Sequence, residues 1–296
     1  IGLNAAGGTT TGAGNIAIGT NSLLQNTTGA SNVSIGTYAL NANTTASNNT
    51  AVGYASLTAN TTGIHNTCVG NASGDAITTA SYNTGMGSGA LGTNILSGAN
   101  VAVGQDCLAT HNLASAANGY NTAVGTNAGV VVTTGVENTL IGGSAGDSIT
   151  DGSTNTCIGK NAGHTITTGG GNTLIGREAN ASAVGVDTEI TIGYNATGSG
   201  TNTVTIGVGA TDATLNIDGS DTSWAAASDE RLKKNIATST AGLSFIKDLR
   251  PVTYEWKNKG EVSSSIEKYY EENSTEPCRG VGGSFHGFIA QEVKQV

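Results

Sequence analysis

The chain has 296 residues, of which 45 are glycine, 2 are proline and 4% are aromatic, which is too few large apolar side chains for a conventional packed interior. High glycine without proline or a three-residue period excludes collagen, and a formal net charge of −9 argues against nucleic-acid binding. Because no apolar run approaches the roughly eighteen residues of a membrane helix, we expect no membrane insertion.

The charged side chains divide the chain into two regions. Residues 1–210 carry 10 of them, and residues 211–296 carry the other 23. This change predicts one domain over 1–207, a linker over 208–227 and a second domain over 228–296. The chain begins in mid-pattern at Ile1-Gly2 and stops within a motif, so we expect it to be a piece of a longer protein.

Residues 1–207 repeat with a period of 17 residues. A glycine follows a short β-branched segment in every copy, and these glycines are 17 residues apart except for one interval of 21 and a last interval of 14. Seventeen residues are too few for a unit that contains a helix. The period therefore predicts one coil of an all-β solenoid, and coils about 4.8 Å apart would make a rod of roughly 60 Å. The repeating glycines are Gly2, Gly19, Gly36, Gly53, Gly70, Gly87, Gly104, Gly125, Gly142, Gly159, Gly176, Gly193 and Gly207.

Within one coil we predict a strand, a tight bend, a second short strand and a turn. Asn opens the first strand, as in Asn15-Ile-Ala-Ile-Gly19, and we expect the recurring Asn side chains to hydrogen-bond in a ladder. β-Branched residues at alternate positions, such as Ile16 and Ile18, form one face of that strand. A column of small residues lies three positions after the glycine, as at Ser22, and is consistent with close packing between chains.

This unit resembles the head repeats of trimeric autotransporter adhesins, in which Asn or Ser precedes a small residue, Ile or Val, and then Gly. The resemblance covers roughly residues 1–207, although the coil here is longer by a Thr-Thr-Gly-like insertion. It implies a left-handed parallel β-roll in which three chains lie side by side. We therefore expect the chain to form a homotrimer.

The C-terminal region predicts a small α+β domain. Leu243, Ile246 and Leu249 lie on one face of a helix that Pro251 ends, and residues 252–256 alternate as a strand does. Three blocks in this region resemble the peptidase S74 family, the intramolecular chaperones of phage tail fibres and tailspikes. Because the family fold continues past the third block, we expect the domain to be truncated at its C-terminus. The blocks are Ser228-Asp229 with Arg231-Leu232-Lys233 and Asn235-Ile236, then Leu249-Arg250-Pro251-Val252 with Tyr254 and Trp256, then residues 287–293.

The resemblance implies autocatalytic release of the chaperone, with cleavage at Ser228-Asp229. By position, Ser228 is the nucleophile and Lys233 the general base, or Lys234 if the register differs by one. The ordinary pKa of lysine is near 10.4, so burial or a nearby cation must lower it before the amine can act. From these residues alone, a helix N-cap followed by a solvated basic face explains the segment better.

The remaining reactive groups have simpler interpretations. Cys68, Cys107 and Cys157 occupy small-residue positions of the repeat, so we expect buried fillers in place of disulfides. The histidines lack metal-ligand spacing, and we predict neither a metal nor a cofactor. We expect solvent-facing turn positions for His65, His111, His164 and His286.

Together these features predict a structural tail-fibre or spike protein of a virion, with a receptor or glycan on the host surface as its partner. Its enzymatic activity would be a single self-cleavage. A bacterial cell-surface adhesin, with an extracellular location, is the alternative. A glycan-cleaving tailspike would need paired carboxylates in a cleft, and the only close acids within one coil are Asp147 and Asp151.

Overall fold

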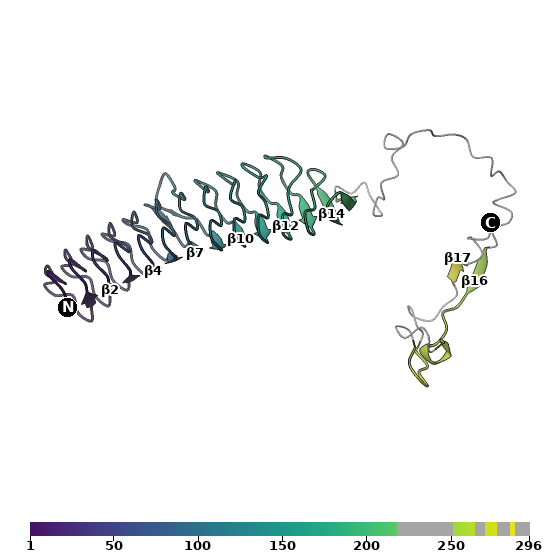
Figure 1. Ribbon diagram of the computed structural model, residues 1–296, viewed down its shortest axis with the longest axis horizontal. Coiled ribbons are helices and arrows are strands. Elements are labelled where there is room, and N and C mark those ends of the chain that lie inside the picture. Colours follow the sequence, from purple (N-terminus) through teal and green to yellow (C-terminus); the bar gives the residue numbers. More distant parts are fainter. Residues whose placement is uncertain (218–250, 264–269, 277–284, 288–296) are drawn as a thin grey trace. The chain divides into compact units, whose positions relative to one another are not determined.

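The computed structural model describes residues 1–217, 251–263, 270–276 and 285–287. Residues 1–217, which we call the shaft, form a stack of coils with one short strand in each coil of the main sheet (Figure 1). The sheet has thirteen strands in sequence order, and neighbours from the first strand to β14 pair in parallel between successive repeats, so that Ile16 lies beside Val33. The predicted all-β parallel solenoid is confirmed. The strands are β1 (Ile16–Ile18), β2 (Val33–Ile35), β3 (Thr50–Val52), β4 (Thr67–Val69), β5 (Thr84–Met86), β7 (Val101–Val103), β9 (Thr122–Val124), β10 (Thr139–Ile141), β11 (Thr156–Ile158), β12 (Thr173–Ile175), β13 (Ile190–Ile192), β14 (Thr203–Val208) and β15 (Thr211–Asn216).

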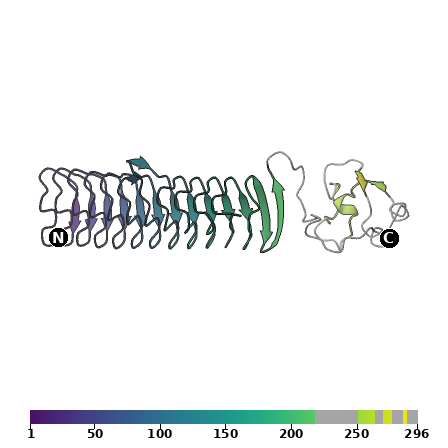
Figure 2. The same ribbon diagram turned by 90° about the horizontal axis from the view of Figure 1, so that it is seen from above.

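An antiparallel hairpin closes the C-terminal end of the shaft. β14 pairs in parallel with β13, and β15 returns along β14 with Thr211 opposite Val208 (Figure 2). β15 thereby occupies the edge on which a further coil would stack. Residues 211–216, which the sequence placed in the linker 208–227, belong to the sheet.

The coil that ends at Gly125 is longer than the others by four residues, which form a side ribbon. Within it, β8 (Ala117–Asn118) pairs in parallel with β6 (Ser97–Gly98) of the preceding coil. These two strands lie outside the main sheet and project from the stacked coils (Figure 2). The additional residues therefore extend outward and leave the register of the main strands unchanged, since Val101 still pairs with Thr122.

Each strand points its middle residue into the coil and its two neighbours outward. From β2 to β13 the middle residue is buried, whereas the first and third are partly exposed. The β-branched residues thus form the outward face, because successive side chains of a strand alternate between its faces. The third positions make an uninterrupted apolar line, here called the outer column: Ile18, Ile35, Val52, Val69, Met86, Val103, Val124, Ile141, Ile158, Ile175, Ile192 and Ile206.

The segment after the repeating glycine forms turns in place of the expected second strand. Asn21 and Leu23 have φ angles of 56° and 53°, outside the strand region. Coil-to-coil hydrogen bonds still continue, since the N–H of Leu23 donates to the carbonyl of Ala39 at 2.9 Å. Between the two left-handed residues, Ser22 turns inward and is 0% exposed. The expectation that this small-residue column packs between chains is therefore wrong.

The repeating glycine allows neighbouring coils to approach closely. Gly19 has a φ angle of 129°, which side chains rarely adopt, and an added Cβ would lie 2.6 Å from the carbonyl carbon of Gly36 in the next coil. Glycine therefore recurs at this position because no side chain fits between the stacked coils.

A ladder of buried asparagines joins each coil to the next, as the sequence predicts. The Oδ1 atom of Asn138 accepts the backbone N–H of Asn155 at 2.9 Å, and its Nδ2 atom donates to the carbonyl of Gly152 at 2.9 Å. The bond to the next backbone N–H recurs at every coil from Asn15 to Asn172. Each side chain thereby satisfies buried backbone groups that would otherwise cost about 1–3 kcal/mol each.

Glu189 ends the ladder with a different side chain. Its backbone N–H donates to Asn172 as the ladder requires, and its carboxylate is fully buried. That carboxylate accepts hydrogen bonds from the backbone N–H and hydroxyl of Ser182 and from the backbone N–H of Gly200. These donors compensate for the burial of the charge.

The coil interior is filled in two alternative ways. One type has Leu four positions after the repeating glycine and a polar residue three positions later, whereas the other has Gly and then Ile or Val. A Cβ added to Gly74 would lie 2.9 Å from Cδ1 of Ile77, so the aliphatic side chain fills the space that Leu fills in the first type. The first type comprises Leu23/Asn26, Leu40/Asn43, Leu57/Asn60, Leu91/Asn94 and Leu108/His111, and the second Gly74/Ile77, Gly129/Val132, Gly146/Ile149 and Gly163/Ile166.

Converting one coil type into the other should be tolerated only when both positions change. Leu57→Gly alone leaves a cavity that costs about 2–5 kcal/mol, and Asn60→Ile alone overpacks the coil by about 1–3 kcal/mol. The double variant reproduces the Gly74/Ile77 arrangement of the next coil, so we expect its stability to lie within about 1 kcal/mol of wild type. Thermal unfolding of the four proteins measures this coupling, and additive losses would contradict it.

The described part of the C-terminal unit contains two strands and one turn of helix. β16 (Val252–Tyr254) pairs antiparallel with β17 (Phe285–Gly287), and the 3₁₀ turn η2 spans Lys259–Glu261. Over the described ranges, no helix is long and apolar enough to cross a membrane.

Candidate functional site

The predicted cleavage machinery lies outside the residues that the structure describes. This applies to Ser228, Asp229 and Lys233, and to the alternative base Lys234. The helix predicted over residues 243–249 lies outside them as well. The dyad and the cleavage site therefore stay predictions.

Two of the three C-terminal blocks meet in space. The strand expected over 252–256 is confirmed for Val252–Tyr254, and Val252 pairs with Gly287, the first residue of the third block. Beyond the strand, the ring of Trp256 packs edge-on against that of Tyr254, with centroids 5.3 Å apart. Blocks separated by about 30 residues are thus neighbours in one small sheet.

An ion-pair cluster joins two described segments of the same unit. The Nζ atom of Lys259 lies 2.9 Å from a carboxylate oxygen of Glu276 and 3.0 Å from one of Glu271. The hydrogen bond that Lys259 donates to Glu276, followed by the one it donates to Glu271, raises the pKa of Lys259 above its ordinary value. Both glutamates are solvent-exposed and Lys259 is partly exposed, so the cluster positions the segment 270–276 with little net stabilisation.

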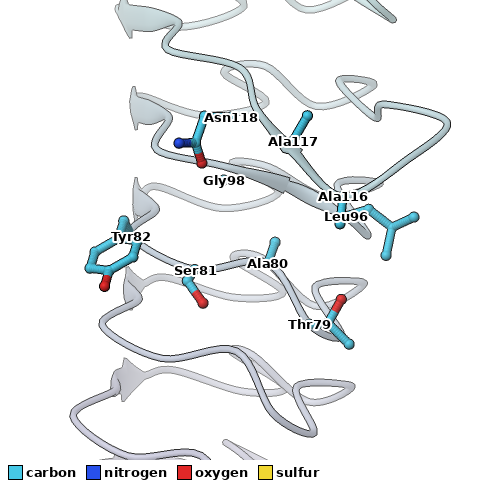
Figure 3. Close-up of a pocket in the computed structure, with 9 residues that line it drawn as sticks. All are labelled: Thr79, Ala80, Ser81, Tyr82, Leu96, Gly98, Ala116, Ala117 and Asn118. Carbon is cyan, nitrogen blue, oxygen red and sulfur yellow. The ribbon is translucent and has the colours of Figure 1, made fainter.

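The shaft carries a cavity of about 330 Å³ beside its side ribbon (Figure 3). Its floor and one wall come from residues that precede β5, and its opposite wall comes from β6 and β8 of the ribbon. Tyr82 lies at one end with its ring exposed, and Asn118 lies across from it (Figure 3). No charged residue lines the cavity, which is bounded by Thr79, Ala80, Ser81, Tyr82, Leu96, Gly98, Ala116, Ala117 and Asn118.

A buried Ser–His contact joins the expanded coil to the preceding coil. The Nε2 atom of His111 is 2.9 Å from the hydroxyl of Ser97, which also accepts a hydrogen bond from Asn100. Both Ser97 and His111 are 0% exposed, so no substrate can reach the hydroxyl and the pair holds the coil together. The expectation that His111 faces solvent is wrong, because it occupies the interior position that Asn94 fills in the preceding coil.

Comparison with known families identifies the C-terminal region. Residues 228–296 match the family described as chaperone of endosialidase, peptidase S74. The C-terminal part of the chain is therefore similar to the chaperone-of-endosialidase family. No curated protein and no solved structure matches the chain. A β-solenoid followed along the chain by this match is consistent with a tail-fibre-like protein that has a C-terminal chaperone domain.

The three cysteines of the shaft are buried fillers, as predicted. Cys68, Cys107 and Cys157 are free and 0% exposed. Burial raises the pKa of each thiol to about 12, which keeps it neutral and unreactive.

The exposed histidines and the acid pair lie on turns of the shaft. His65 is exposed, as expected, and His164 places Nδ1 2.7 Å from a carboxylate oxygen of Asp147 in the preceding coil. Asp151, the other member of the acid pair, instead accepts the hydroxyl of Thr150 at 2.7 Å. Among the described residues, no three His, Cys, Asp or Glu side chains gather as a metal site would require.

His111 should make the shaft sensitive to acid. Burial lowers the pKa of His111 from 6.5 to about 4, so between these values the unfolded chain binds a proton that the folded chain does not. The contribution of neutral His111 to the free energy of unfolding is intact above pH 6.5 and decreases as the pH falls, by about 2 kcal/mol at pH 5. We expect His111→Asn, which copies Asn94, to lose less thermal stability than wild type between pH 7 and pH 5. Equal losses would show that His111 is not the titrating group.

Proposed function

We propose that the chain is the shaft of a homotrimeric virion tail fibre or spike with a host-attachment role. Its C-terminal chaperone brings three chains into register and is then released by cleavage at Ser228-Asp229. The observation that carries the proposal is the match of residues 228–296 to the chaperone-of-endosialidase family directly after a β-solenoid. A bacterial surface adhesin accounts for the shaft but leaves the chaperone unexplained.

The outer column supports side-by-side packing of identical chains. Its side chains are apolar at every coil from β1 to β14 and remain partly exposed in the single chain, as at Ile18 (41%), Met86 (43%) and Ile206 (44%). Continuous apolar surface of this kind marks an interaction site in a soluble protein. A second copy presents the same 17-residue period, so every coil can pack at once, which no partner with a different repeat achieves.

A removable chaperone suits the kinetics of such a fold. Nearly all contacts of the sheet join residues one repeat or more apart, and three chains that pair with the wrong coil would still bury much apolar surface. Such long-range assembly is slow and prone to misalignment. A domain that aligns the C-terminal ends fixes the register, and its later removal leaves a trimer protected by a high barrier to unfolding.

The cleavage chemistry needs a hydroxyl and a neutral amine. Lys233 would remove the proton of the Ser228 hydroxyl as this oxygen attacks the scissile carbonyl, and the new amine terminus would take up a proton as the peptide bond breaks. Water then hydrolyses the resulting ester to free the carboxylate. Because the amine must be neutral, the rate of cleavage should rise with pH until the lysine has titrated.

Self-cleavage can be tested on a denaturing gel. We expect the full chain to run as two fragments, Ser228→Ala and Lys233→Ala to run as one band, and the control Ser223→Ala to cleave as wild type does. Wild-type protein that stays whole in the presence of its complete C-terminal domain, or cleavage of Ser228→Ala at the same bond, would remove the protease assignment for this chain while leaving the family match intact.

The trimer interface can be tested separately by sedimentation. Ile141→Asp places a charge on the outer column, where Ile141 is 37% exposed in the single chain. Burying that charge between chains costs several kcal/mol, so we expect the variant to sediment as a smaller species. Thr134→Asp, on an exposed turn of the same coil, is the control that should remain trimeric. A monomeric wild-type protein would exclude the proposed homotrimer.

A further inference from the structure

One column of turn residues becomes aromatic around the expanded coil. His65, Tyr82, Ala99 and Tyr120 lie two residues before β4, β5, β7 and β9, so the strand register places them in successive coils. The rings of His65 and Tyr82 are stacked, with centroids 5.2 Å apart and planes inclined by 10°. Elsewhere in this column the shaft has small or polar residues, such as Ser31, and the charged Glu137 in the coil after Tyr120.

The column leaves an open space between two tyrosines. Tyr82 and Tyr120 are 60% and 57% exposed, and the small side chain of Ala99 occupies the coil between them. Two coils span about 10 Å, whereas a ring stacked on an aromatic face lies about 3.5–4.0 Å from it. A flat six-membered ring can therefore lie over Ala99 on the face of Tyr82 that does not stack on His65.

Hydrogen-bonding groups line the cavity that borders this space at Tyr82. The Nδ2 atom of Asn118 donates to the hydroxyl of Tyr120 at 2.8 Å, which orients the amide at the ribbon wall of the cavity. On the facing wall, the Ser81 hydroxyl accepts the backbone N–H of Ile64 at 3.0 Å and keeps its own hydrogen available to a ligand. The hydroxyl of Thr79 lies further along the same wall (Figure 3). Aromatic faces together with neutral donors and acceptors suit a polyhydroxylated ring.

We propose that Tyr82, Tyr120, Asn118 and Ser81 form a binding site for a neutral oligosaccharide, here called the ribbon site. The absence of charge from the residues that line the cavity argues against a phosphate, sulfate or carboxylate ligand. A chain with a net charge of −9 would also repel a polyanion. The expanded coil supplies Asn118 and β8, which form the ribbon wall together with β6 of the preceding coil, so the site depends on the insertion. This inference rests on the proposed attachment function and names the region and ligand class through which it acts.

The ribbon site can be tested with an array of immobilised neutral and sialylated oligosaccharides, followed by titration of each bound sugar in solution. We expect binding of neutral oligosaccharides by the full chain. Tyr82→Asn should weaken it at least tenfold, since loss of one stacked ring costs about 1.4 kcal/mol, and Asn118→Ala should weaken it as well. Asn is already accepted in this column at Asn48, with a φ angle of 62° against 64° for Tyr82, so the fold should be preserved.

Tyr38→Asn is the matched control. Tyr38 is exposed, has a φ angle of 62° and lies two residues after its repeating glycine, in a different column from Tyr82. Asn21 fills the column of Tyr38 one coil earlier, and Tyr38 is remote from the ribbon. Its replacement should leave binding unchanged. The inference is overturned if no neutral sugar binds, if only sialylated sugars bind, or if Tyr82→Asn binds as wild type does. It is also overturned if Tyr82→Asn changes the oligomeric state, since Tyr82 would then be an interface residue. None of these outcomes alters the self-cleavage gel, so the site and the proposed fibre can fail independently.

Discussion

Coil-to-coil hydrogen bonding is the constraint on which the shaft depends. Each strand has only three residues over most of the sheet, and each turn donates to the next coil, so the polar backbone groups are satisfied one repeat away. The Asn ladder satisfies buried groups that the short strands leave unpaired, as Asn138 does for Asn155 and Gly152. A residue inserted into this frame would shift every later partner. The 17-residue period follows from that requirement.

The same constraint decides where variation is accepted. Inside the coil, Leu57 and Ile77 fill equivalent space from different positions, so the interior changes its residues without changing its backbone path. Where the two coil types meet, the Oδ1 atom of Asn60 has no hydrogen-bond partner among the described residues, because Ile77 replaces the next amide. Outside the coil, the four-residue expansion leaves the register intact by projecting as a ribbon. Functional diversity in such a rod is therefore expected at projecting turns.

The outward direction of the β-branched residues links the shaft to its chaperone. A strand that buries its small middle residue must expose its aliphatic neighbours, and a single chain then presents an apolar line along its full sheet. Three chains can cover these lines for one another, but identical coils offer many wrong registers. A terminal domain that aligns the chains resolves this degeneracy, and the position of the matched family after the closing hairpin is consistent with that role.

The sequence alone determined the period, the main strand of each coil, the Asn ladder and the buried cysteines, because each follows from spacing or from a residue type repeated in one position. It also identified the C-terminal family from three blocks. Only the tertiary structure decided which way the repeating side chains point. Alternation along a strand separates two faces, but it does not show which face is buried. Hence Ser22 is in the core and Ile18 outside. Structure was also needed at His111, because the sequence did not show whether this residue lies on a solvent-facing turn or at the interior position that Asn fills in other coils. The ribbon site depends on residues from successive coils, and their proximity is a consequence of stacking that no local motif records.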